Sequence, residues 1–250
     1  MLGWLAADCT ARLDPGDMCA SGSLDGENSM SDSDYPPEPW YLGGSMEVSA
    51  FLVPVSVLPA SFRLPDGRQP IRLGDRVVVG VAAVEYHRGG VLQYNELLVA
   101  VPSFGRGGLR ITIPQIWVDS PTSLRGGREL WGIPKQLADF GWNRAHKDID
   151  FGMRLDNSPV ATFSARPGGR MLPGVRQFGL PILQELGGKV KLSRNRVISR
   201  VFSQHAKWTF AQDGPLAYLA GMRPVLSFSL RDASITFGMD PTRTKRTTQS

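Results

Sequence analysis

Lys135 is the residue whose surroundings in the sequence most clearly suggest chemistry. The chain has six lysines among 28 basic residues, and this one lies in an apolar segment beside Pro134, close to Trp131 and Ile133. A lysine that is partly removed from water has a lowered pKa, because burial disfavours its charged form. A neutral amine is a nucleophile that forms Schiff bases with ketones. The alternative is a surface lysine whose stem packs on apolar neighbours while its ammonium stays in water.

A carboxylate within an apolar run is the second candidate. Glu96 lies between Leu92 and Val101, and buried carboxylates are rare unless they are paired. One interpretation is acid–base or orienting work beside an imine, since carboxylates with shifted pKa values gather in catalytic clefts. The other interpretation is a glutamate on an edge strand that faces solvent.

Other catalytic and binding chemistries lack a supporting pattern. The histidines, His87, His146 and His205, do not have metal-ligand spacing, so we expect no metal. The glycine-rich turns lack the Gly-Lys-Ser/Thr ending of a phosphate-binding loop. Ser120 and Ser123 lack the Gly-x-Ser-x-Gly setting of a hydrolase nucleophile.

Composition divides the 250-residue chain into three parts. Residues 1–34 hold seven acidic residues and one basic residue without periodicity, which predicts a disordered acidic extension, with Met30 as a candidate start. Residues 35–240 have the composition of one globular domain, and residues 241–250 are predicted to be a flexible basic tail. Both cysteines lie in the extension, which excludes a disulfide framework in the domain.

The net charge of +5 is concentrated towards the C-terminal end, where residues 189–250 hold eleven basic and three acidic residues. A basic end could suggest nucleic acid. Here the basic residues alternate with apolar ones, which is typical of solvated faces of strands or helices, and no nucleic-acid-binding motif accompanies them. The sequence has neither a run of about 20 apolar residues nor the pattern of a signal peptide. We therefore expect a cytoplasmic protein that binds neither nucleic acid nor a membrane.

Short strands separated by turn signals dominate the domain. Val-, Ile- and Leu-rich runs predict strands at 48–57, 76–86, 93–101, 109–118, 148–155, 159–165, 189–202 and 224–237. Short helices are predicted at 58–62, 133–140 and 216–222. Many short strands at roughly ten-residue spacing predict a mainly β fold, a closed or cone-like antiparallel barrel with a few short helices.

Two segments resemble the acetoacetate decarboxylase family. The stretch GGRELWGIPKQLADF resembles the active-site signature of that family, with matches at Gly127, Arg128, Glu129, Pro134 and Lys135. The upstream stretch LQYNELLVAVP resembles a second block of the family, in which Tyr94 and Glu96 match, and the interval between the two blocks also fits. The resemblance implies a cone-shaped antiparallel β-barrel, chemistry without a cofactor, and Lys135 as the Schiff-base nucleophile.

The resemblance also implies a function. It implies a lyase that decarboxylates a small β-keto acid through an iminium on Lys135, with Glu96 moving protons or holding the carbinolamine. We expect the substrate pocket to be formed by Trp117, Arg128, Glu129, Trp131, Ile133, Gln136, Met46 and Tyr94. For the tryptophans the alternative is plain core, and for Arg128 and Glu129 it is a structural pair at the barrel mouth. The expected partners are a small keto acid and further copies of the chain in a homo-oligomer.

Two departures from the family leave the reaction open. Acetoacetate decarboxylase has a second lysine after the nucleophile, where this chain has Gln136, and an active-site arginine where a loose alignment places Met46. Such an arginine suits a bidentate contact with a substrate carboxylate, and the candidate substitutes are Arg63, Arg125 and Arg128. Relatives without these two groups resemble aldolase-dehydratases that act on pyruvate-like keto acids. A barrel that only binds a small ligand is the third alternative.

Overall fold

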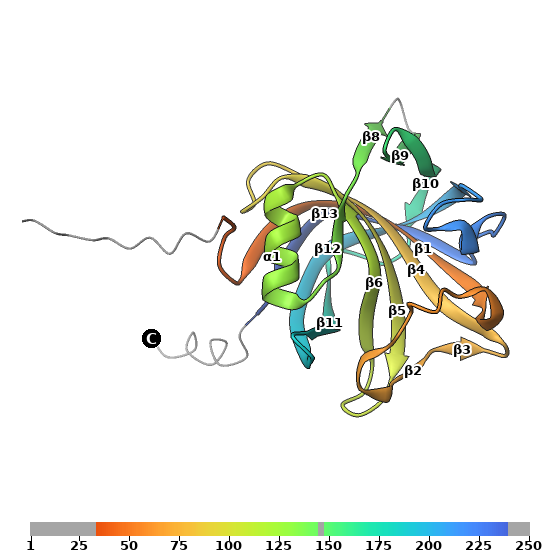
Figure 1. Cartoon of the computed structure of the whole chain (residues 1–250). Helices are drawn as coiled ribbons and strands as arrows, with labels where there is room; N and C mark the ends of the chain where they lie inside the picture. Colours follow the sequence, from red (N-terminus) through yellow and green to blue (C-terminus); the bar gives the residue numbers. More distant parts are fainter. Residues whose placement is uncertain (1–33, 145–147, 240–250) are drawn as a thin grey trace, which may run out of the picture. The chain divides into compact units, whose positions relative to one another are not determined.

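The computed structural model describes residues 34–144 and 148–239 (Figure 1). The predictions for the acidic extension, apart from Asp34, and for the C-terminal tail lie outside these residues. The longer strands are β1 (Trp40–Pro54), β4 (Arg76–Tyr86), β5 (Tyr94–Phe104), β6 (Arg110–Val118), β9 (Ile149–Leu155), β10 (Ser158–Arg170), β11 (Arg176–Leu186), β12 (Lys189–Phe210) and β13 (Leu226–Phe237). The shorter strands are β2 (Gln69–Pro70), β3 (Arg72–Leu73), β7 (Lys135–Leu137) and β8 (Asp139–Asn143). The described helix is α1 (Pro121–Trp131), with 3₁₀ turns η1 (Val55–Val57), η2 (Pro65–Gly67) and η3 (Ala217–Leu219).

Seven of the strands form a closed ring. Neighbours follow the order β11–β6–β5–β4–β1–β13–β12, and β12 pairs with β11 again. The pairings in this ring are antiparallel except β6–β11, which is parallel where Ile111 meets Ile182. There the side-chain amide of Gln184 donates to the carbonyl of Ile113 (2.8 Å) and accepts from its N–H (3.4 Å). The predicted mainly β fold is confirmed, with a mixed rather than a wholly antiparallel sheet.

Strands β1, β4, β5 and β6 each carry side chains into two separate cores. Successive residues of a strand point to opposite faces, and both faces of β1, β4, β5 and β6 are covered. One core continues into β9 and β10 and includes Phe51, Val79, Leu97, Trp117 and Phe151. The other core includes Met46, Val84, Tyr94, Ile116 and Val197. Because both faces are buried, these strands appear in the sequence as nearly continuous apolar runs.

Helix α1 has clear signals at both ends. The Ser120 hydroxyl accepts a hydrogen bond from the N–H of Ser123 (3.1 Å), and Pro121 occupies the first turn, where its missing N–H costs little. Gly132 ends the helix in a left-handed conformation (φ 67°) that suits glycine. The helix contacts β6, β7, β11 and β12 at one side of the sheet (Figure 1). It is not long and apolar enough to cross a membrane, and neither is any other described helix.

The predicted helices are wrong in two of three places. Residues 133–140 contribute β7 and β8 instead, because Pro134 disfavours a helical backbone in the residue before it and the next residues pair with β6. Residues 58–62 follow η1 and form no helix, while 216–222 contain only the single turn of η3. The predicted strand 76–86 matches β4, the other predicted strands overlap strands with shifted ends, and β11 was not predicted.

Candidate active site

Lys135 is the first residue of β7, and two elements hold it in place. β7 runs parallel to β6, with Lys135 beside Ile116. Helix α1 packs on the lysine stem at Gly127, where a Cβ atom would lie 2.6 Å from Lys135 Cδ. Arg128, in the same helix, donates from Nε to the carbonyl oxygen of Lys135 (2.8 Å). The Gly-Arg pair of the signature therefore positions both the backbone and the stem of the lysine.

The ammonium of Lys135 has three oxygen partners. Nζ lies 2.8 Å from Ser123 Oγ, 3.1 Å from Glu96 Oε2 and 3.4 Å from Tyr94 Oη. The side chains of Lys135 and Glu96 are each 4% exposed, so this ion pair is shielded from water. An ammonium carries three protons, and each has an acceptor here. Glu96 supplies the opposite charge that a buried ammonium requires.

Electrostatics keep Lys135 protonated in this arrangement. Burial lowers the pKa of Lys135, but Tyr94 and Glu96 together raise it by more, so the pKa lies above its ordinary value of 10.5. Burial raises the pKa of Tyr94 to about 12 and that of Tyr86 well above its ordinary range, so both phenols stay neutral near pH 7. The expectation of a lowered lysine pKa is wrong, because it considered burial without a carboxylate in contact with the amine.

A cavity of about 60 Å³ opens beside Lys135. That volume exceeds the roughly 10–15 Å³ that one water needs, and it suits a small ligand. The walls are mostly apolar, and the polar side chains among them belong to Tyr86, Tyr94, Glu96, Lys135 and Asn195. The Asn195 amide is already bonded to backbone groups of Leu180 (2.9 Å) and Gly238 (2.8 Å). Lys135 is the one cation among the described residues of the wall.

The structure brings six of the ten predicted site residues together at this cavity. They are Met46, Tyr94, Glu96, Trp131, Ile133 and Lys135. Trp131 packs edge-to-face on Trp40, another wall residue, with ring centroids 4.8 Å apart.

The other four predicted residues do not line the cavity, so their expected place in the pocket is wrong. Trp117 belongs to the other core, because β6 points it away from Lys135. Gln136 follows Lys135 in an extended strand, so it faces the opposite side; it is exposed and lines a separate surface hollow with Arg128. Glu129 is exposed and accepts a hydrogen bond from the Tyr35 hydroxyl (2.7 Å) rather than pairing with Arg128.

No substitute arginine reaches the cavity from the three candidate positions. Arg63 and Arg125 are exposed, and Arg125 forms a surface ion pair with Asp34. Arg128 is bonded to the backbone of Lys135 on the outside of the cavity. Met46, at the position where the alignment places the arginine of the decarboxylase, lines the same cavity as the lysine.

Sequence reasoning missed Ser123, Tyr86 and Trp40. Ser123 is fully buried and contacts the lysine nitrogen, yet its own sequence surroundings give no signal for that role. A signal for the close helix was present in the adjacent glycines of the signature. A Cβ at Gly126 would lie 2.5 Å from the Trp40 ring, just as one at Gly127 would meet the lysine. Adjacent glycines in a helix indicate that another group approaches its backbone closely.

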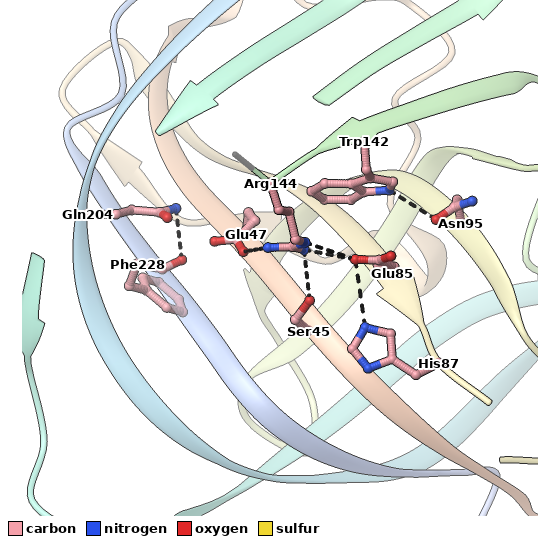
Figure 2. Close-up of polar contacts among 9 residues, drawn as sticks. All are labelled: Ser45, Glu47, Glu85, His87, Asn95, Trp142, Arg144, Gln204 and Phe228. Carbon is pink, nitrogen blue, oxygen red and sulfur yellow. Dashed lines mark hydrogen bonds and ion pairs between the residues drawn. The ribbon is translucent and has the colours of Figure 1, made fainter. Parts of the chain in front are cut away.

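A second buried carboxylate belongs to Glu47, which follows the wall residue Met46 in β1 and therefore lies on the opposite face of that strand. Figure 2 shows the contacts of Glu47. The Glu47 side chain is 1% exposed, and its Oε1 lies 3.5 Å from Arg144 Nη1. Arg144 also donates to Glu85 (3.1 Å) and Ser45 (3.0 Å), and its guanidinium packs over the Trp142 ring. These contacts attach the end of β8 to β1 and β4. Among residues 34–144 and 148–239, no group of three or more His, Cys, Asp or Glu could hold a metal ion.

The fold and the site define a class of protein in which a ring of strands buries a lysine–glutamate pair beside a small apolar cavity. The family model described as acetoacetate decarboxylase (ADC) matches residues 55–216, well over half of the chain. The chain therefore belongs to the acetoacetate decarboxylase family. No curated protein matches it.

Solved structures with the same fold include enzymes with different printed descriptions. The enduracididine biosynthesis enzyme MppR, complexed with the condensation product of pyruvate and imidazole 4-carboxaldehyde, is 17% identical; the match covers 90% of this chain and 97% of that one, with a TM-score of 0.61. Acetoacetate decarboxylase from Legionella pneumophila is 15% identical, with 88% and 95% coverage and a TM-score of 0.60. An acetoacetate decarboxylase-like enzyme from Sphingomonas wittichii RW1 is 14% identical, with 82% and 91% coverage and a TM-score of 0.55. At these identities the likeness shows the fold alone.

Proposed function

We propose that the protein is a Schiff-base-forming lyase that decarboxylates a small β-keto acid through an iminium on Lys135. The observation that carries this proposal is the buried pair of Lys135 Nζ and Glu96 Oε2, 3.1 Å apart at the wall of an apolar cavity. An amine that passes its proton to an adjacent carboxylate becomes a nucleophile without help from solvent. Membership of the acetoacetate decarboxylase family supports the same chemistry.

Because the raised pKa keeps Lys135 protonated, the first step must remove a proton, and Glu96 Oε2, 3.1 Å from Nζ, is placed to accept it. When a ketone carbonyl reaches Nζ, Glu96 takes one proton and the neutral amine attacks the carbonyl carbon. A second proton moves from nitrogen to the former carbonyl oxygen, which gives the carbinolamine. Protonated Glu96 then returns its proton to this oxygen, which leaves as water while the C=N bond of the iminium forms. Glu96 ends the sequence as a carboxylate, ready for the next cycle.

The apolar wall favours the loss of carbon dioxide from this iminium. The C–C bond to the carboxylate breaks, and its electron pair moves into the iminium to give an enamine and carbon dioxide. An apolar wall stabilises a carboxylate poorly, and the step removes that charge. Protonation of the enamine carbon and hydrolysis of the resulting iminium release the ketone and restore Lys135. Since the iminium is the electron sink, the proposal requires no cofactor.

An aldolase-dehydratase that uses the same lysine on a pyruvate-like keto acid is the second candidate. The fold shared with MppR in complex with a pyruvate condensation product favours it. The reaction keeps the substrate carboxylate throughout, however, and no guanidinium among the described wall residues is placed to bind it. Decarboxylation removes the carboxylate charge from the apolar cavity, whereas the aldol route keeps it there, and for that reason we place decarboxylation first. A barrel that binds a small ligand without turnover is the remaining alternative.

Borohydride reduction in the presence of acetoacetate or pyruvate tests the proposal. We expect a covalent adduct that peptide mapping places on Lys135, and loss of both adduct and turnover in Lys135→Arg, because a guanidinium does not deprotonate in proteins. Release of carbon dioxide would identify a decarboxylase, and formation of an enal from pyruvate and an aldehyde would identify the second candidate. An adduct without turnover would indicate an imine-forming binder. An adduct on another lysine, or undiminished turnover in Lys135→Arg, would overturn the mechanism.

A further inference from the structure

Ser123 approaches the lysine nitrogen from behind the cavity. Its hydroxyl is the nearest of the three oxygen partners of Nζ, at 2.8 Å. Glu96 and Tyr94 line the cavity, whereas Ser123 is fully buried in the first turn of α1 and is not part of the wall. The nitrogen therefore lies between one acceptor on the helix side and two acceptors on the cavity side.

The Ser123 hydroxyl acts as a hydrogen-bond acceptor towards Lys135. A serine hydroxyl donates one hydrogen bond and accepts through its lone pairs. An ammonium can only donate, so the Ser123 oxygen presents a lone pair to Lys135 Nζ, 2.8 Å away.

We propose that Ser123 is a catalytic residue that keeps the lone pair of Lys135 Nζ directed towards the cavity. The inference rests on the proposed Schiff-base function. Rotation about the Cε–Nζ bond would exchange the three positions on nitrogen, but acceptors at Ser123 and Tyr94 hold two of the N–H groups. The proton that leaves Nζ is then the one that points to Glu96, which lines the cavity. The lone pair that remains on Nζ therefore faces the cavity.

The same contact persists after the bond to substrate has formed. An iminium nitrogen is planar and carries Cε, the substrate carbon and a single hydrogen. Ser123 accepts that hydrogen from the helix side, so the substrate carbon extends into the cavity and rotation of the iminium about the lysine stem is restrained. A hydrogen bond to a charged group is among the stronger ones, so Ser123 also stabilises the cationic intermediate.

Ser123→Ala tests the proposal, with Ser120→Ala as the matched control. Both variants remove a hydroxyl from the first turn of α1, but Ser120 caps the helix and Ser123 contacts the nitrogen. In Ser123→Ala we expect the rate of borohydride-trapped adduct formation to fall about tenfold or more, with kcat reduced and KM nearly unchanged. The reason is that loss of a hydrogen bond to a charged group changes a rate by about tenfold. Ser123→Thr, which keeps the hydroxyl, should restore much of the rate. Ser120→Ala should lower the melting temperature without changing the trapping rate.

The pH profile separates a chemical role from a structural one. The titratable and charged groups around the amine are the same in both variants. They are Glu96 and Tyr94 on β5, Tyr86 on β4, and the Arg128 guanidinium at the Lys135 carbonyl. Loss of the Ser123 acceptor should move the high-pH limb of the rate about one unit lower, because one partner of the charged amine is gone. An unchanged rate and profile would overturn the inference, as would equal losses in Ser120→Ala and Ser123→Ala. Absence of a Lys135 adduct in the wild-type protein would instead overturn the proposed function, and the inference with it.

Discussion

Two carboxylates buried on opposite faces of the ring strands have different kinds of cationic partner. Glu96 pairs with Lys135 where both side chains are 4% exposed. Glu47 pairs with Arg144 (Figure 2), which is 36% exposed beside a hollow of about 850 Å³. A guanidinium keeps its proton in proteins, but an ammonium can release one. The Lys135 pair can therefore transfer a proton to its carboxylate, while the Arg144 pair can only attach β8 to the ring.

Removing the carboxylate on each face should give the sharpest contrast. Glu96→Gln should lower kcat/KM by about 10²–10⁴-fold, because the amide cannot accept the lysine proton. The pKa of Lys135 should also fall, since a partner that raises it is gone. Glu47→Gln is the matched control and should change kcat/KM by less than about twofold, because Glu47 does not line the lysine cavity. Equal losses in the two variants would show that the faces do not differ as proposed.

Gly127→Ala should affect the lysine pair through geometry alone. The new Cβ would lie 2.6 Å from Lys135 Cδ, so the stem must move. Displacement of a reacting group by about 1 Å costs on the order of 100-fold in rate, while the helix itself gains from alanine. Steady-state kinetics and thermal unfolding measure the two effects. Gly141→Ala is the control, because its Cβ meets nothing within 4 Å, and a similar loss of rate in that variant would argue against the steric explanation.

Arg144→Met should cost stability and leave catalysis intact. Breaking a buried ion pair from one side costs about 3–5 kcal/mol. Arg144 is about one-third exposed, so we expect roughly 2 kcal/mol after screening by solvent. Urea unfolding measures this loss, and the double variant with Glu47→Gln should recover part of it. A large fall in kcat/KM without a change in unfolding would contradict the structural role of Arg144.

The pH dependence of unfolding isolates the Glu47 contribution to this effect. Burial raises the pKa of Glu47 above its ordinary value of 4.5, against the opposing effects of Ser229, Arg144 and Arg231. A raised folded-state pKa gives stability that is complete below the unfolded value and is lost as pH rises through the folded pKa. The free energy of unfolding of Glu47→Gln, relative to that of the wild-type protein, should therefore increase as the pH rises from 4.5 through the folded-state pKa of Glu47. A difference that does not change with pH would show that Glu47 does not titrate as described.

The mainly β fold could be predicted from the sequence, but the core towards which each strand side chain points could not. Trp117 and Trp131 both lie in apolar surroundings, yet they belong to different cores. When a strand is buried on both sides, no polar residue marks the outward face. The alternation of β6 fixes the direction of Trp117 only after its pairing is known.

The helix was missed because its contacts require residues that are poor helix formers. Gly126 and Gly127 weaken the helical signal of α1, although each makes room for a bulky side chain. Conversely, Ile133, Leu137 and Phe140 have the i, i+4, i+7 spacing typical of a helix, but they lie before or within short strands. The buried pair of Glu96 and Lys135 could be predicted only from the family resemblance, since the two residues are 39 positions apart in the sequence.

Gln136→Lys should have the smallest effect, and it tests how well β7 separates the two faces. From the sequence alone, a lysine here would lower the pKa of Lys135 by repulsion between like charges. The structure predicts otherwise, because Gln136 is exposed and lines a hollow shared with Arg128 and Glu185, on the far side of the strand from the amine. Exposed charges interact weakly through water, so the pH profile of adduct formation should move by less than about 0.3 unit. That shift is well below the one expected for Ser123→Ala, which acts on the nitrogen directly. A displacement of a full unit would mean that β7 turns residue 136 towards the cavity during the reaction, and the separation of the two faces would no longer hold.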